Sequence, residues 1–544
     1  MNREINLHSI LELEKQIEEH EGHESIVIQL KRTRNSLLNV STLPPETLGT
    51  IFCWNATPDG EFGGISRGSY NFLLVCHRWF EVASSTPELW SFWGNSTHDW
   101  THRHHRCKTA PLDLVLDGYD GLNLDKRVRD AIEDRAARDT IRRVHLRSAS
   151  VILLSVVVSL LLVPPEGETR IISVESFIVQ VTGTDVVDIS IFFSHYRLPR
   201  LQCLRLSGCK IKSWDLLKSQ TTILTTLELA TIDTSPIPTL SQLLSILSSN
   251  PLLQYLTLSY GLAPDIIDDD QPPSRVALRH LKLLRFNGAY GHAFQLLSRL
   301  ELPDKMDDLH LLLYKCSPLD LSRTVGPYFG DRVRRQGGFP GGGLWVSVNH
   351  GPRLFTLAAG DPRNGDNPAE TDWFVKVVTV MGMELADRRA EELCFSLIAP
   401  IPWEQVTSLQ TSLPILRSEE LCVEMCSLTY LHLIEVTFSE WFIEPDIRGP
   451  RTFKDLLPSL DRIEIIQPTL GYDGWNPLTN FLTRRAAVGS QISSLRMSSG
   501  YWMPPEVIDN IKRAVKVFER PDKSHESECK SYAALSFLCV SYCP

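Results

Sequence analysis

A serine in the segment GISRG, residues 64–68, has the spacing of a hydrolase nucleophile. In the pattern G-x-S-x-G the serine sits on a sharp turn between a strand and a helix. No apolar strand precedes it, because the preceding residues 60–63, GEFG, are typical of a loop. We therefore interpret the segment as a flexible insert and do not predict an esterase site at Ser66.

A group of imidazole and thiol side chains follows within ten residues and could in principle hold zinc. Its members are His98, His102, His104, His105 and Cys107. A structural zinc site normally draws on two separated ligand pairs, and Arg103 and Arg106 would repel a dication. We favour a solvated linker over residues 96–109 and predict no metal site.

Two further patterns lack the partners that their chemistry needs. Cys422/Cys426 and Cys539/Cys543 have C-x3-C spacing without nearby histidine pairs, so we interpret them as buried thiols. The glycines of residues 337–343 lack the lysine and hydroxyl of a phosphate-binding loop. The sequence therefore predicts a protein that is not an enzyme and needs no cofactor.

Length and charge restrict the class of protein. A chain of 544 residues exceeds the usual single-domain range of roughly 100–200. The net charge of -10 argues against nucleic acid and anionic membranes as partners. The longest apolar run, residues 151–163, falls short of the about 20 residues that span a bilayer, so a buried core segment is expected. Without a basic, apolar leader, we expect a cytoplasmic or nuclear protein with free thiols.

Two kinds of helical pattern occupy the first 95 residues. Apolar residues spaced by threes and fours predict an amphipathic helix within residues 1–38, interrupted near Gly22, which pairs with another helix or packs on the following domain. From Leu43 to Trp93, apolar spacing and helix-starting prolines predict three short helices.

The second helical segment carries three motifs that resemble a known family. They are the opening Leu43-Pro44, the central LVCHRW of residues 74–79, and the closing PELW of residues 87–90. Together they resemble an F-box, and the whole arrangement is similar to fungal F-box-like proteins with C-terminal leucine-rich repeats. The resemblance implies that residues 39–95 bind a Skp-type adaptor, which joins the protein to a cullin. The expected adaptor-binding residues are Leu43, Pro44, Leu48, Ile51, Phe52, Val75 and Trp79.

Internal repeats dominate the rest of the chain. Residues 201–211 fit the whole leucine-rich template L-x-x-L-x-L-x-x-N/C-x-L. Shorter matches begin at Ile141, Val174, Leu224, Leu253, Leu278, Met306, Leu428, Leu460 and Ile492. They predict an α/β leucine-rich-repeat solenoid over residues 110–318 and 389–515, followed by a tail, residues 516–544. Residues 319–388 read as an insertion, with a Gly-rich loop at 334–345 and a hairpin turning at Asn349 to Pro352. One further repeat is expected near residues 390–395.

The third and fifth positions of L-x-x-L-x-L point away from the apolar core, because strand side chains alternate. We call the surface that they form the polar strand face. Its predicted members are Cys203/Arg205, Thr226/Glu228, Tyr255/Thr257, His280/Lys282, Asp308/His310, Tyr430/His432, Arg462/Glu464 and Ser494/Arg496. Such a mixed-charge strip is suited to binding the surface of another protein. The alternative is that the strip is only the solvent-exposed face of a one-sided sheet and binds nothing. The expected substrate-binding residues are Arg205, Glu228, Tyr255, Lys282, His310, Tyr430 and His432.

The resemblance to F-box proteins, together with the repeats, implies a substrate-recognition subunit of a Skp-cullin-F-box type ubiquitin ligase. Such a subunit acts by proximity, raising the effective concentration of a substrate lysine near the charged ubiquitin carrier. The alternative is a leucine-rich binding scaffold whose F-box-like helices only cap the repeats or bind another partner. The sequence names no substrate.

Overall fold

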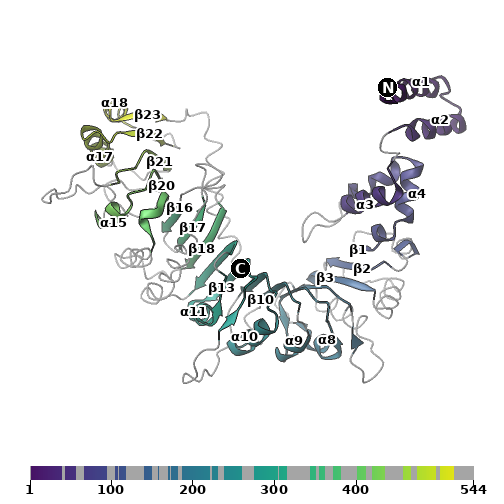
Figure 1. Cartoon of the computed structure of the whole chain (residues 1–544), viewed down its shortest axis with the longest axis horizontal. Helices are drawn as coiled ribbons and strands as arrows, with labels where there is room; N and C mark the ends of the chain where they lie inside the picture. The colour runs from purple at the N-terminus through teal and green to yellow at the C-terminus, as the bar shows by residue number, and fades with distance from the viewer. Residues whose placement is uncertain are drawn as a thin grey trace. The chain divides into compact units, whose positions relative to one another are not determined.

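The structure is a computed structural model of the whole chain (Figure 1). It describes residues 2–38, 43–56, 67–94, 105–107, 110–117, 140–149, 157, 170–171, 173–181, 187–220, 223–230, 238–259, 275–303, 306–314, 344–350, 354–361, 372–380, 401–411, 419–434, 457–466, 475–497 and 503–519. The chain divides into two units, Met1–Leu253 and Gln254–Pro544. Each is described by itself.

The first unit begins with two helices, α1 (Asn2–Glu19) and α2 (Glu24–Ser36), which contact each other. Gly22, in the short connection, has φ +109°, a left-handed backbone that favours glycine. The interruption predicted near Gly22 is therefore the turn between two helices.

The following helical segment is built around one aromatic cluster. It consists of α3 (Pro45–Ala56), the 3-10 helix η2 (Arg67–Leu74), α4 (His77–Ser85) and the 3-10 helix η3 (Pro87–Trp90). Phe52 stacks on Phe72 at 4.6 Å between ring centroids and lies 5.2 Å from the ring of Trp79. The second predicted helix is divided, because Cys76 is extended and separates η2 from α4.

A parallel sheet follows in the first unit. Its strands pair in chain order: β1 (Phe92–Gly94), β2 (Leu112–Asp117), β3 (Ile141–Ala149), β5 (Ser176–Val181), β8 (Cys203–Ser207) and β10 (Thr226–Ala230). Short pairs join β4 (Arg170–Ile171) to β7 (Tyr196–Arg197) and β6 (Val187–Asp188) to β9 (Cys209–Lys210). The helices are α8 (Ser190–His195), α9 (Asp215–Gln220) and α10 (Leu240–Ser249), and α9 contacts both of the others (Figure 1).

The leucine template explains how these strands bury one side. In β8, Leu204 and Leu206 are buried, while the alternate residues Cys203, Arg205 and Ser207 are half-exposed. Asn250 ends α10 and is itself buried: its side chain donates to the carbonyl of Ile246 and accepts from the amide of Leu224. One amide side chain therefore ties the end of a helix to the segment that leads into β10.

The second unit contains a longer sheet. Its strands pair in the order β11 (Tyr255–Ser259), β13 (Leu283–Ala289), β15 (Asp308–Tyr314), β18 (Asp372–Val380), β17 (Leu354–Asp361), β16 (Leu344–His350), β19 (Val406–Thr411), β20 (Tyr430–Ile434), β21 (Arg462–Ile466), β22 (Ile492–Met497) and β23 (Val515–Glu519). Only β17 is antiparallel to its neighbours among these strands.

Short elements connect these strands. They are the pair β12 (Val276–Ala277) and β14 (Leu300–Glu301), α11 (Tyr290–Arg299), the 3-10 helix η8 (Trp403–Gln405), α15 (Glu419–Glu424), α17 (Trp475–Ala487) and α18 (Pro505–Ala514). Strands β16 and β17 form the antiparallel hairpin predicted in the insertion. Their pairing extends to His350 and Phe355, so the turn lies after the predicted Asn349 start.

The leucine spacing misleads at one strand. The template fits Leu278, Leu281 and Leu283 in the sequence, but β13 begins at Leu283 and buries Leu284 and Phe286. Its register pairs Leu283 with Tyr255 and Arg285 with Thr257. The prediction of His280 and Lys282 on the polar strand face is therefore wrong, because the template is displaced by three residues; Leu283 and Arg285 hold those positions.

Several predicted features lie outside the described residues. They are Ser66, His98, His102, His104, the glycines of 337–343, the repeat expected at 390–395, Cys539, Cys543 and the tail from residue 520. In the apolar run of 151–163 the structure describes only Val157, which is buried. Of the predicted buried thiols that it describes, Cys422 is buried but Cys426 is exposed, which corrects that prediction.

Candidate functional site

The helical segment leaves several large apolar side chains in solvent. Of the predicted adaptor-binding residues, Pro44, Ile51 and Val75 are exposed, and Leu43 and Trp79 are half-buried. Leu48 and Phe52 are core residues with 0% and 1% exposure, so the structure removes these two from the predicted surface.

Three further apolar residues of the helical segment are exposed and were not among the predicted adaptor-binding residues. They are Trp54, Leu74 and Phe80, with exposures of 76%, 86% and 42%. Helical spacing could have identified Trp54, because it lies three residues after Ile51, whereas Leu48 and Phe52 share the opposite, buried side. Leu74 is the last residue of η2. The sequence pattern assigned it to the same helix as α4, so its exposure was not predicted. The elements that carry these residues, α3, η2 and α4, pack against each other.

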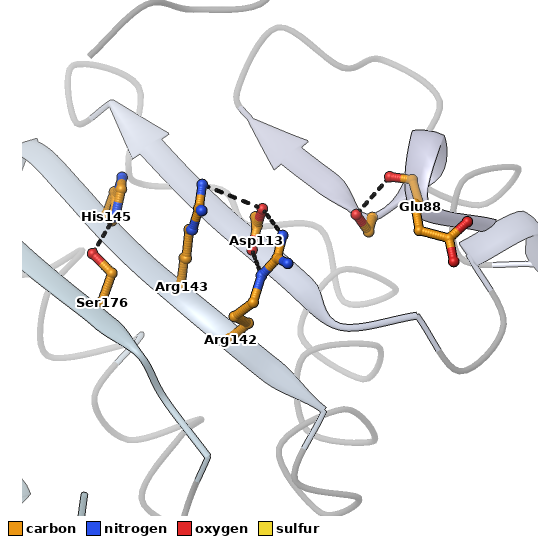
Figure 2. Close-up of polar contacts among 7 residues, drawn as sticks. Glu88, Asp113, Arg142, Arg143, His145 and Ser176 are labelled. Atoms are coloured by element: carbon orange, nitrogen blue, oxygen red, sulfur yellow. Dashed lines mark hydrogen bonds and ion pairs between the residues drawn. The ribbon is translucent and has the colours of Figure 1, made fainter. Parts of the chain in front are cut away.

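A charged network lies where the helical segment meets the sheet (Figure 2). Arg142 donates two hydrogen bonds to Asp113, at 3.0 Å to Oδ1 and 2.7 Å to Oδ2, and Arg143 lies 3.9 Å from Oδ2. A register shift after Leu112 places both arginines at the same carboxylate. The amide of Asp113 also donates to the carbonyl of Ser91, at 2.9 Å.

This network holds the end of η3 against the first strands. The Ser91 hydroxyl donates to the carbonyl of Glu88 at 2.7 Å, and β1 begins at the next residue (Figure 2). Hydrogen bonding to Asp113 raises the pKa of Arg142 above its ordinary value. The Asp113 backbone amide therefore links the end of the helical segment to β2, while its carboxylate pairs with the two arginines of β3.

His145 occupies the fifth template position of β3. Its Nε2 lies 2.9 Å from the hydroxyl of Ser176 on the adjacent strand (Figure 2). Burial, followed by the charge of Arg143, lowers the pKa of His145 from 6.5 to about 4. The imidazole is therefore neutral near pH 7, and this part of the polar strand face presents hydrogen-bonding groups beside its arginines.

The predicted substrate-binding residues Arg205 and Glu228 are brought together across β8 and β10. Their register positions are directly opposite, and Arg205 Nε lies 3.6 Å from Glu228 Oε2. Glu228 keeps 30% of its side chain exposed, so the pair is accessible at its acidic end. Both residues lie on the polar strand face as predicted.

The polar strand face of the second unit begins with two exposed residues, Tyr255 and Arg285. Tyr255 is 41% exposed, and Arg285 lies 3.2 Å from Asp308 on the next strand. His310 follows Asp308 in β15 and pairs in register with Arg285. Predicted residues Tyr255 and His310 therefore lie on this face, while Arg285 takes the place predicted for Lys282.

The same positions are buried on β20. Tyr430 is 6% exposed and His432 is 2% exposed, so the prediction that both are accessible to a substrate is wrong. Tyr430 donates a hydrogen bond to Glu464 on β21, and its ring stacks near that of His432. Burial lowers the pKa of His432, and Glu464 opposes that effect.

Unsatisfied polar atoms mark this buried part of the sheet. Neither ring nitrogen of His432 has a hydrogen-bond partner, and Gln410 Oε1, from the residue opposite it on β19, has none either. A buried polar group without a partner costs about 1–3 kcal/mol, so this patch is locally destabilising. The alternation of strand side chains predicts which face of the sheet a residue lies on, but it does not predict whether another segment covers that face.

The described residues hold no metal-ligand set: among them, no group of three or more His, Cys, Asp or Glu side chains could bind an ion. All seven cysteines in that part of the chain are free, and burial raises the pKa of Cys209 to about 12, so it remains a thiol. No helix within the described ranges has both the length and the apolar character to cross a membrane.

No protein-family model matches this chain, and no curated protein matches its sequence. The two surfaces described above, the exposed apolar residues of the helical segment and the polar strand face, are therefore the features that indicate a function.

Proposed function

We propose that this protein is the substrate-recognition subunit of a Skp-cullin-F-box type ubiquitin ligase. In this proposal, the helices of residues 43–90 bind the Skp-type adaptor as an F-box does, and the strands form leucine-rich repeats whose polar face binds a protein substrate. The chain needs no catalytic residue of its own, since ubiquitin is transferred by associated subunits.

One observation carries the adaptor half of the proposal: Ile51, Trp54, Leu74, Val75 and Phe80 are all at least 40% exposed. Several solvent-exposed apolar side chains on one short helical segment are typical of a protein-binding surface. Aromatic anchors usually supply most of the binding energy at such a surface, which suits Trp54.

The paired opposite charges of the polar strand face support the proposal that this face binds a protein substrate. Arg205–Glu228 and Arg285–Asp308 pair opposite charges on adjacent strands, and Tyr255 adds an exposed aromatic ring. Interfaces between proteins are enriched in tyrosine and arginine, whereas a site for a small apolar ligand would be enclosed by apolar side chains.

Co-purification with a Skp-type adaptor tests the first half. We expect the full chain to retain the adaptor, and a Leu74→Glu/Val75→Glu variant to lose at least about 100-fold in affinity, because two charges would enter an apolar contact. These positions are preferable to Trp79, whose ring packs on Phe52 in the core. Leu252→Glu is the matched control, since Leu252 is 44% exposed and lies outside the helical segment.

The scaffold alternative makes a different prediction in the same experiment. If the wild-type chain captures a stable protein partner but neither adaptor nor cullin, the ligase assignment is wrong. Once a substrate is captured, Tyr255→Ala, Arg285→Glu and His310→Ala should weaken its binding and leave adaptor binding intact. Normal capture by all three, with loss on substitution of Arg334 and Arg335, would assign substrate recognition to the inserted loop.

A further inference from the structure

The helices α1 and α2 form a hairpin without a core. No residue of either helix whose side chain the structure describes is buried. The most covered apolar residues of the two helices are only half-buried, and they include Ile10, Leu13, Ile17, Val27 and Leu30. An isolated helix of 13 residues, the length of α2, is marginal in water, and its contact with α1 buries no side chain, so packing on a further surface would stabilise the pair.

A second stripe of each helix combines an exposed apolar residue with charge. On α1, Glu14, Lys15 and Glu18 follow Leu11 by three, four and seven residues, and Leu11 is 57% exposed. On α2, Lys31 and Arg32 follow Ile28 by three and four residues, and Ile28 is 43% exposed. The α1 stripe therefore carries two glutamates against one lysine beside its exposed leucine, whereas the α2 stripe carries two cations beside its exposed isoleucine.

The whole helices show the same division of charge. Helix α1 carries five glutamates against Arg3 and Lys15, whereas α2 carries Lys31, Arg32 and Arg34 against Glu24. Within one copy the contact is modest, with Arg34 Nη1 3.9 Å from Glu14 Oε1. A hairpin with one acidic and one basic helix is complementary to another hairpin of the same kind.

We propose that the α1–α2 hairpin is a dimerisation element that packs on the hairpin of a second copy of this chain. A two-fold axis would place α1 of each copy against α2 of the other, so that the acidic stripe meets the basic stripe twice and a four-helix core forms. This inference is independent of adaptor binding, which uses residues from Leu43 onward.

The first test measures the mass of the full chain in solution at several concentrations by light scattering. We expect a dimer of twice 61.5 kDa. Leu11→Glu/Ile28→Glu should raise the dissociation constant by at least about 100-fold, because it places charges in the apolar contact. Leu252→Glu, an exposed leucine elsewhere in the first unit, should leave the mass unchanged. A monomeric wild-type chain, or a Leu11→Glu/Ile28→Glu variant that stays dimeric, would overturn the proposal.

A charge exchange separates pairing between copies from pairing within one copy. Glu14→Lys/Glu18→Lys and Lys31→Glu/Arg32→Glu should each weaken the dimer about tenfold, since like charges then face each other. Mixing the two variants should restore a mixed dimer, because every acidic helix again faces a basic one. If mixing restores nothing, the charges act within a single hairpin and the two-fold arrangement is wrong. Leu74→Glu/Val75→Glu should remain dimeric, which keeps this result separate from adaptor binding.

Discussion

The two units place a histidine at the same template position and treat it differently. His145 in the first unit lies 2.9 Å from the Ser176 hydroxyl and sits beside charges that are already paired. His432 in the second unit is 2% exposed, and neither of its ring nitrogens has a hydrogen-bond partner. Burial lowers the pKa of both. The position in the strand therefore determines which face a side chain lies on. The surrounding residues determine whether its polar atoms find hydrogen-bond partners and so whether the side chain stabilises the fold.

The same contrast extends to the way in which each unit ties helices to strands. The first unit uses the neutral side chain of Asn250, whereas the second uses the cation of Arg485, which is 1% exposed. Arg485 donates to the carbonyls of Leu457, Leu460 and Ser490. Leu457 has φ +52°, so this guanidinium holds a strained turn in place.

The largest effect is expected from Arg485→Met. This change leaves three carbonyls without their donor and should lower the free energy of unfolding of the second unit by about 4 kcal/mol. Denaturant unfolding followed by circular dichroism measures it. Arg484→Met, at the half-exposed neighbouring residue, is the control and should cost less than about 1 kcal/mol. Equal losses in the two variants would show that the buried donor is not the cause.

Acid should weaken the first unit through His145. Its pKa is about 4 when folded and 6.5 ordinarily, so the unfolded chain binds the proton first as the pH falls. The stability present above pH 6.5 is therefore lost progressively down to about pH 4, by about 3 kcal/mol. Unfolding midpoints measured across this window test the sign and size. His145→Gln, which keeps a donor for Ser176 without titrating, should flatten the dependence; an unchanged slope would assign the loss to other groups.

The ion pairs of the two units should differ in strength. Arg142 donates two hydrogen bonds to Asp113, at 3.0 Å and 2.7 Å, and the two side chains are 34% and 11% exposed. The two bonds from Arg285 to Asp308 are longer, at 3.4 Å and 3.2 Å, and the side chains are 54% and 26% exposed. A double-mutant cycle with Asp113→Asn and Arg142→Gln should give a coupling of about 2 kcal/mol. The matching cycle with Asp308→Asn and Arg285→Gln should give less than about 1 kcal/mol, because solvent screens it. Couplings of equal size would remove the distinction.

The smallest effects should have opposite signs at the two histidines. His145→Leu removes the hydrogen bond to Ser176 and should destabilise the first unit by about 1 kcal/mol. His432→Leu removes two buried atoms without partners and should stabilise the second unit by a similar amount, about 1 kcal/mol. The urea midpoints of unfolding of both variants, compared with that of the wild-type chain, test the two signs. A loss of stability in His432→Leu would mean that the imidazole has a favourable contact.

Predictions from the sequence succeed where a local pattern decides the structure. Alternating leucines identify buried strand positions such as Leu204 and Leu206, and Gly22 marks the turn between α1 and α2. The template fails at β13, where leucines at residues 278, 281, 283 and 284 allow two registers. Only pairing with β11 selects between them, because that register buries both Leu284 and Phe286.

The sequence by itself determined the succession of a helical segment and parallel strands, since the period of apolar residues is set by local backbone geometry. Only the tertiary structure decided which apolar residues remain exposed: it buries Phe52 and leaves Trp54 in solvent, and it covers His432 while Tyr255 stays open. Exposure depends on which distant segments pack on a surface, and no local spacing records those contacts.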